Sequence, residues 1–155
     1  MLRLSKLTDY AVVVMVRLSH GVCPNGAPVQ TSPGIAAATG VPEPTVAKVL
    51  KALAAAGMVT SQRGAHGGYR LRLPLEAVSI ADVIAAIDGP IALTACVEGH
   101  PGNCEVRGVC AVKGRWDLVN DAIHAALSSI TLADMRAAPV PRAPRAHKFV
   151  SAAVE

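Results

Sequence analysis

Residues 32–73 contain two short helical patterns separated by a glycine turn and followed by a hairpin pattern. This order constrains the fold more than any other feature of the sequence. Residues 33–39 are predicted to form a helix that Ser32 caps, Pro33 begins and Gly40 ends. A second helix runs through "TVAKVLKALAAAG" to Gly57. Its expected inward face is Val46, Val49, Leu50 and Leu53. Two short helices joined by a glycine-containing turn are typical of a helix-turn-helix unit.

A hairpin pattern follows the second helix directly. The runs "MVTSQ" (58–62) and "YRLRL" (69–73) are strand-like, and the second alternates apolar residues with arginine. Between them, "RGAHGG" is a basic, glycine-rich turn. The pattern predicts a two-stranded wing beside the helix-turn-helix unit.

Three further helices are expected. One covers 8–20, with Thr8 as its cap; another covers 79–88, capped by Ser79; a third covers 111–134. The expected apolar face of the first is Val12, Val13, Met15 and Val16, and that of the third is Trp116, Val119, Ile123, Leu127 and Ile130. A helix as long as 111–134 has no evident partner within the chain, so we expect it to form an antiparallel homodimer.

The predicted fold class is therefore mainly α, a winged helix-turn-helix with a two-stranded wing and a long C-terminal dimerisation helix. The expected domains are a winged-helix DNA-binding domain (1–78), a linking helix with a cysteine loop (79–110), the dimerisation helix (111–135) and a tail (136–155). The tail is rich in Pro, Ala and Arg and is expected to be disordered.

Charge is distributed unevenly along the chain. Residues 1–73 contain eight Lys or Arg against two Asp or Glu, whereas residues 74–135 contain three against eight. A basic first half indicates a polyanionic partner for that half, and double-stranded promoter DNA is the expected one. The expected DNA contacts on the second helix of the pair are Thr45, Lys48 and Lys51, and those on the wing are Arg63, Gly64, His66 and Gly67. The plainer interpretation stays open: the two lysines form a solvated helix face, and the glycines only turn the hairpin.

Three of the four cysteines lie within residues 95–110, "ACVEGHPGNCEVRGVC". The N-terminal region carries an apolar run of only six residues, too short for a signal sequence or a membrane span, so a cytoplasmic protein without membrane association is expected. Cytoplasmic thiols seldom form lasting disulfides, so the cluster indicates metal or redox chemistry. Thiolates favour an iron-sulfur cluster, while zinc binding and redox thiols remain alternatives. Cys23 lies apart and is expected to be a bystander.

No enzyme motif is evident. The chain has no phosphate-binding loop, paired acid and base or metal-hydrolase motif, and a cysteine near His100 is the one hint of a nucleophile. We therefore expect a binding protein. An iron-sulfur carrier or thiol redox protein is the alternative class, but it would leave the winged-helix half without a role.

Four segments together resemble the Rrf2 family of bacterial winged-helix regulators. They are "LSKLTDYAVVVMVRL", "GVPEPTVAKVLKALAAAGMV", "SQRGAHGGYRL" and "VSIADVIAAIDGP", and the similarity covers about residues 1–135. The string "DGPIALTACVEG" is most similar to the subgroup that regulates the SUF iron-sulfur assembly operon. The resemblance implies a homodimeric transcription factor, usually a repressor, whose DNA affinity depends on an iron-sulfur cluster, [2Fe-2S] or [4Fe-4S].

The resemblance also implies roles for individual residues. Arg63 matches the wing arginine placed in the minor groove, and Thr45 and Lys48 match positions that face bases. Cys96, Cys104 and Cys110 match the three cluster-binding cysteines.

Their spacing, C-x7-C-x5-C, is that of the nitric-oxide-sensing branch. Where the cluster-supply-sensing branch has a ligating histidine, this chain has Lys113. Similarity to the nitric-oxide branch points to Asp9, from the partner subunit, as fourth ligand. Plain stabilisation of a helix N-terminus by Asp9 remains an alternative, as do His100 and Glu105 as ligands.

Overall fold

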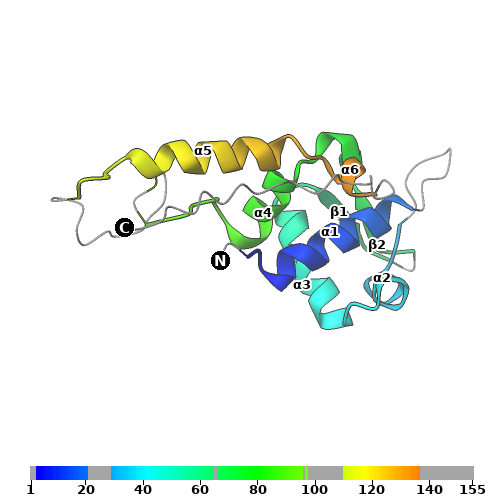
Figure 1. Ribbon diagram of the computed structural model, residues 1–155. Helices are drawn as coiled ribbons and strands as arrows, with labels where there is room; N and C mark the ends of the chain where they lie inside the picture. Colours follow the sequence, from blue (N-terminus) through cyan, green and yellow to red (C-terminus); the bar gives the residue numbers. More distant parts are fainter. Residues whose placement is uncertain (1–2, 21–28, 65, 96, 98–109, 137–155) are drawn as a thin grey trace, which may run out of the picture.

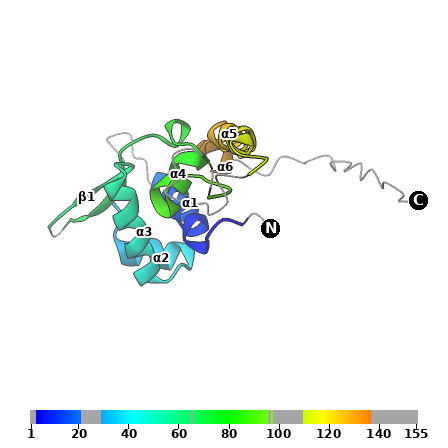
Figure 2. The same cartoon turned by 90° about the vertical axis from the view of Figure 1, so that its left-hand side faces the viewer.

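The computed structural model describes residues 3–20, 29–64, 66–95, 97 and 110–136. These residues form α1 (Lys6–Ser19), α2 (Ser32–Thr39), α3 (Glu43–Ala55), β1 (Val59–Gln62), β2 (Gly68–Leu71), a short 3-10 helix η1 (Leu75–Ala77), α4 (Ile80–Asp88), α5 (Arg115–Ser128) and α6 (Leu132–Arg136). The mainly α class, the helix-turn-helix and the two-stranded wing are confirmed (Figure 1). Viewed end-on in Figure 2, α5 lies on a different side of the body from the wing and from the α2–α3 pair.

Helix α1 starts earlier than predicted. Ser5, not Thr8, is the N-cap, and its hydroxyl accepts a hydrogen bond from the Thr8 backbone N–H at 3.1 Å. Thr8 instead lies inside the helix and is 1% exposed. The predicted apolar face was also largely wrong, because the buried apolar residues are Ala11, Val14, Met15 and Leu18. Val13 is 38% exposed.

The helix-turn-helix pair follows the sequence closely. Thr31 caps α2 by accepting a hydrogen bond from Gly34 N–H at 3.2 Å, one residue before the predicted cap, Ser32. Gly40 ends α2 with φ of 72°, the left-handed conformation that favours glycine. The four residues predicted to face inward on α3 are fully buried: Val46, Val49, Leu50 and Leu53. Its opposite face is therefore free to meet a partner.

The wing is an antiparallel pair of four-residue strands. Its register joins Val59 to Leu71 and Gln62 to Gly68. The second strand ends at Leu71, so the predicted alternation does not extend to Leu73, which is 42% exposed. A Cβ at Gly67 would lie 2.7 Å from the carbonyl oxygen of Gln62 and therefore could not be accommodated.

The helix expected over 111–134 is interrupted. It comprises α5 and α6, separated around Ile130 and Thr131. At the break the backbone pairs with the start of α4: Ile80 N–H donates to Ile130 O, and Leu132 N–H donates to Val78 O, both at 2.9 Å. This pairing satisfies backbone groups that a continuous helix would have bonded internally.

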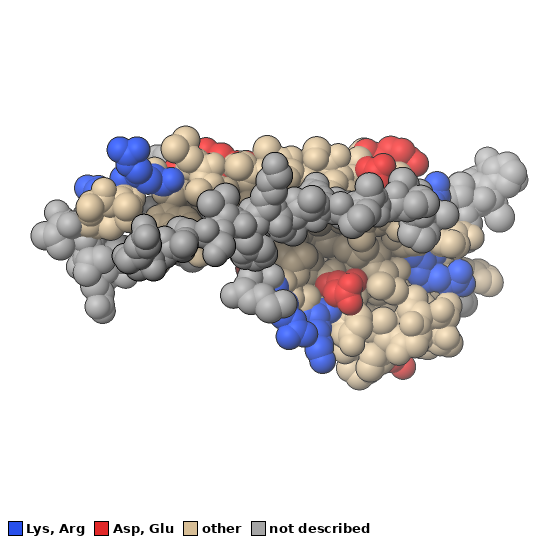
Figure 3. Space-filling view, in the orientation of Figure 1, with Lys and Arg blue, Asp and Glu red and all other residues tan. Residues whose placement is uncertain are grey.

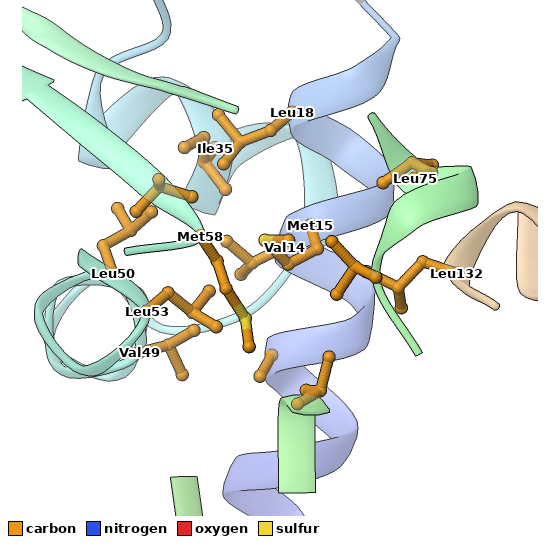
Figure 4. Close-up of a cluster of buried hydrophobic side chains, with 14 of the residues drawn as sticks. Val14, Met15, Leu18, Ile35, Val49, Leu50, Leu53, Met58, Leu75 and Leu132 are labelled. Atoms are coloured by element: carbon orange, nitrogen blue, oxygen red, sulfur yellow. The ribbon is translucent and has the colours of Figure 1, made fainter. Parts of the chain in front are cut away.

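The core joins the winged helix to the C-terminal segment. Leu132 of α6 is fully buried and points toward α1 in Figure 4, where side chains of α1, α3 and Leu75 of η1 meet. Residues 79–136 are thus not merely appended to the winged helix, because α6 supplies part of its core. Of the tail predicted for 136–155, Arg136 ends α6 and the remainder lies outside the described residues.

Candidate functional site

The outer face of α3 carries the predicted DNA-contacting residues. Lys48 and Lys51 are exposed and Thr45 is half-buried, and their spacing of three residues places them along one side of the helix. The opposite side is packed into the core through the four residues named above. A second helix of a helix-turn-helix unit that buries one face and exposes a basic one is arranged to enter a major groove.

The wing tip has two kinds of glycine. Gly64 has φ of 113° and open space around its Cβ position, and the neighbouring Arg63 and His66 are exposed. The crowded Gly67, in contrast, is needed to close the turn, and its N–H donates to Gly64 O at 2.9 Å. Arg63 and His66 are therefore available to a ligand, whereas Gly67 has a steric role whether or not it touches DNA.

The structure adds further basic residues to the wing. Arg70 and Arg72 are exposed, and Arg70 Nε donates a hydrogen bond to Thr60 Oγ1 across the hairpin at 3.3 Å. The alternation in "YRLRL" placed both arginines on the polar side, but that signal alone did not single them out as candidate contacts. In the space-filling view, Lys and Arg gather on the winged-helix body below α5 and at the outer end of α5, with acidic patches between them (Figure 3).

Only part of the predicted cluster site is described. Cys110 is half-buried and lies shortly before α5, and Asp9 is exposed in the first turn of α1. Cys96 and Cys104 lie outside the described residues, as do Cys23, His100 and Glu105. Within the described ranges, no three His, Cys, Asp or Glu side chains are grouped so as to hold a metal ion. The two predicted ligands that can be placed are nevertheless accessible and carry donors, thiolate and carboxylate, that suit iron.

Asp9 lies at a cleft. The cleft has a volume of about 430 Å³ and lies between the start of α1, the start of α4 and the α5–α6 junction. Its lining includes Arg3 and Lys6 beside Asp9, with apolar side chains such as Ile80 and Ile130. The Asp9 carboxylate is therefore accessible to a ligand that enters this cleft.

Two hydrogen-bond sites hold the described residues that precede the first cysteine. Asp88, the last residue of α4, accepts hydrogen bonds from Ser5 Oγ at 2.9 Å and from Thr8 Oγ1 at 2.6 Å. Farther along, Leu93 N–H donates to Asn120 Oδ1 of α5 at 3.1 Å, and Asn120 is 7% exposed. The stretch leading to the first cysteine is therefore fixed to the start of α1 and to α5.

A winged helix with an exposed basic recognition face defines a DNA-binding protein. The chain belongs to the Rrf2 family, since the family model described as "Iron-dependent Transcriptional regulator" matches residues 4–138. The family's members are transcriptional regulators, which agrees with the expectation of a binding protein rather than an enzyme.

The similarity to named relatives extends along most of the chain. It is 30% identical to the transcriptional repressor NsrR of Streptomyces coelicolor, over 89% of this chain and 90% of NsrR. Among solved structures it is similar to CymR, the global cysteine regulator of B. subtilis, with a TM-score of 0.66, 29% identity and coverage of 88% of this chain and 97% of CymR. It is also similar to T. potens IscR, with a TM-score of 0.61, 30% identity and coverage of 86% and 85%.

None of the helices in the described ranges is both long enough and apolar enough to cross a membrane.

Proposed function

We propose that this chain is a homodimeric repressor that binds promoter DNA of iron-sulfur assembly (SUF) genes in the cytoplasm and reports the state of a bound iron-sulfur cluster. The observation that carries the cluster is the presence of Cys96, Cys104 and Cys110 within fifteen residues of a chain of the Rrf2 family. The string "DGPIALTACVEG", similar to the SUF-regulating subgroup, favours iron-sulfur assembly genes as the target. The family description, an iron-dependent regulator, supports the iron requirement.

The proposed ligands are the three cysteines of one subunit and Asp9 of the other. Thiolates and a carboxylate are suitable ligands for iron. A bound cluster would supply a centre that is lost on exposure to oxygen or nitric oxide or when iron is scarce. The accessible cleft beside Asp9 and the half-buried Cys110 support this assignment.

The route from the cysteine segment to the DNA-binding surface runs through α1. Asp88 directly precedes residues 89–110, and its hydrogen bonds to Ser5 and Thr8 attach it to the helix that carries Asp9. Helix α1 packs in turn against α3, whose outer face carries Lys48. A change in the position of Asp88 would therefore act on the recognition helix through one packed element.

Dimer formation is the second part of the proposal. Along α5, Leu118 is 72% exposed, Val119 44% and Trp116 40%. Complete burial of an exposed side chain of this kind contributes roughly 1.5 to 3 kcal/mol, and these partly exposed side chains would gain a fraction of that. Covering them favours association of two copies through this helix.

Purification without oxygen tests the proposal. A brown dimer with visible absorption is expected, and native mass spectrometry would give its cluster type. Replacing Cys96, Cys104 or Cys110 by Ala should remove the colour and change affinity for the SUF promoter in a gel shift, while Cys23→Ala serves as the matched control and should change neither. A colourless, iron-free protein after reconstitution would contradict the proposal.

Nitric oxide sensing is the second candidate, favoured by the cysteine spacing and the similarity to NsrR. Exposing the brown dimer on operator DNA either to nitric oxide or to an iron chelator separates the two signals. Release of DNA by nitric oxide alone identifies a nitric oxide sensor. An iron-sulfur carrier or thiol redox protein, the candidate of another class, would bind no promoter fragment in either state.

A further inference from the structure

Gln30 joins the edge of the wing that β1 leaves open. Its backbone N–H donates to Tyr69 O at 2.9 Å, and Tyr69 N–H donates to Gln30 O at 2.8 Å. Since β1 occupies the other edge of β2, Gln30 adds a third, one-residue position to the two-stranded sheet. Strand β2 is therefore paired on both sides at Tyr69, next to the Gln62–Gly68 pair that borders the tip of the wing.

The side chain of Gln30 reaches a different element. Its amide Nε2 donates to Arg17 O and to Leu18 O, each at 3.3 Å. Arg17 O also accepts a hydrogen bond from the His20 backbone N–H at 3.1 Å. The carbonyls in the last turn of a helix lack the bonds that a following turn would supply, so the Gln30 side chain adds a donor there and its own position is fixed. Gln30 thus links the end of α1 to β2.

Glycine at position 68 permits this approach. A Cβ at Gly68 would lie 2.5 Å from Gln30 O and 2.8 Å from Val29 Cγ1. The next residue, Thr31, caps α2. Residues 30 and 31 therefore connect α1, the wing and the first helix of the helix-turn-helix pair at one point.

We propose that Gln30 is a positioning residue for DNA binding, which sets the wing at a fixed angle to the helix-turn-helix unit through its two amide hydrogen bonds to α1. The inference rests on the proposed function only in taking Arg63 at the wing tip as a DNA contact. A wing held at one angle presents Arg63 together with α3 and loses less conformational freedom on binding.

Hydrogen exchange of the free protein tests the positioning without DNA. Gln30→Met keeps the backbone pairing and the length of the side chain but removes the amide donor. The exchange of Tyr69 N–H should become about tenfold faster, while amides of α3 keep their wild-type rates. Unchanged exchange at Tyr69, or equal acceleration in α3, would overturn the inference.

Gln30→Lys is the rescue variant, since lysine restores a donor to helix-terminal carbonyls. It should exchange at Tyr69 as the wild type does. Exchange as fast as in Gln30→Met would show that the donor does not hold the wing and would overturn the inference.

A double-mutant cycle with Arg63→Ala then tests the effect on DNA. Gln30→Met should raise the Kd for operator DNA about fivefold in the wild-type background and less than about twofold in the Arg63→Ala background, because only a wing that contacts DNA benefits from being positioned. Equal effects in both backgrounds would overturn the role in DNA binding. If Arg63→Ala alone leaves Kd unchanged, the wing contact of the proposed function fails, and the exchange data still decide whether Gln30 positions the wing.

Discussion

The hydroxyl of Thr8 donates a 2.6 Å hydrogen bond to Asp88 Oδ2, joining the first turn of α1 to the last residue of α4 across eighty positions of sequence. Thr8 is 1% exposed, so bulk water cannot replace Asp88 as the hydrogen-bond partner of its hydroxyl. Ser5 Oγ donates to the other carboxylate oxygen. One carboxylate therefore holds both hydroxyls at the start of α1.

Thr8→Val should lower the free energy of unfolding by about 1 to 3 kcal/mol, because it removes a charge-assisted bond and leaves part of the Asp88 carboxylate without its partner. Urea denaturation followed by circular dichroism measures the change. The control is Thr60→Val, at a half-buried position in the wing whose hydroxyl bonds the exposed Arg70, and it should cost less than about 0.5 kcal/mol. Equal losses in the two variants would contradict this assignment.

Leu132→Ala should destabilise the protein by about 2 to 5 kcal/mol, because the side chain is fully buried against α1 and its removal leaves a cavity. Denaturant unfolding measures it, and Met135→Ala on the same short helix, 53% exposed, is the control. A loss as small as that of Met135→Ala would mean that α6 is not part of the winged-helix core.

The local elements of this fold were predictable because their signals are local. Capping and turn residues placed α2, α3 and the wing within one or two residues, and the apolar spacing on α3 identified all four of its buried residues. Helix α1 was harder, because residues 10–18 are apolar on almost every side and periodicity alone cannot choose the buried face.

The contacts between distant segments were not predictable from local pattern. The break between α5 and α6 depends on backbone pairing of residues 130–132 with residues 78–80. The local signal for it is the capping pattern of Thr131 with Asp134, which the apolar spacing of 111–134 obscured. Gln30 carries no motif, since its role depends on the carbonyls of α1 and on the close approach of Gly68. At the candidate site, the helix-turn-helix and wing patterns identified Lys48, Lys51 and Arg63, which are exposed. They did not single out Arg70 or Arg72, and the bonds of Asp88 required the folded chain.

Thr131 caps α6, since its hydroxyl accepts a hydrogen bond from Asp134 N–H at 3.3 Å and its own N–H donates to Asp134 Oδ2 at 2.8 Å. Acid should weaken this cap. Hydrogen bonds from the side chain and then the backbone of Thr131 lower the pKa of Asp134 below its usual 3.8. A lowered folded-state pKa means that the stabilisation is present above the ordinary carboxyl pKa and is lost as pH falls through the folded value. NMR titration of the Asp134 carboxyl measures the pKa directly. In Thr131→Val the pKa should move back up toward 3.8, and an unchanged titration would contradict the hydroxyl's contribution.

Leu118→Glu should weaken the proposed dimer by at least about tenfold in its dissociation constant, because it places a charge at the most exposed large apolar side chain of α5. Sedimentation equilibrium measures the effect. His124→Glu, at an exposed polar position on another side of the same helix, adds a negative charge away from Leu118 and tests whether the effect is specific to the apolar face. Dimers of unchanged affinity in Leu118→Glu would exclude this part of α5 from the interface.

Arg63→Ala should weaken specific operator binding by about 1 to 3 kcal/mol and reduce the slope of log K against log salt concentration by about one. The physical reason is that an exposed arginine beside the open Gly64 can enter a minor groove and neutralise phosphate charge there. Fluorescence anisotropy with operator and with unrelated DNA, at several salt concentrations, measures both quantities. Arg115→Ala at the start of α5 removes the same charge outside the winged helix and should leave the ratio of specific to non-specific affinity unchanged. A ratio that stays constant in Arg63→Ala as well would assign the wing arginine to general charge attraction, and recognition of the operator would then fall to α3.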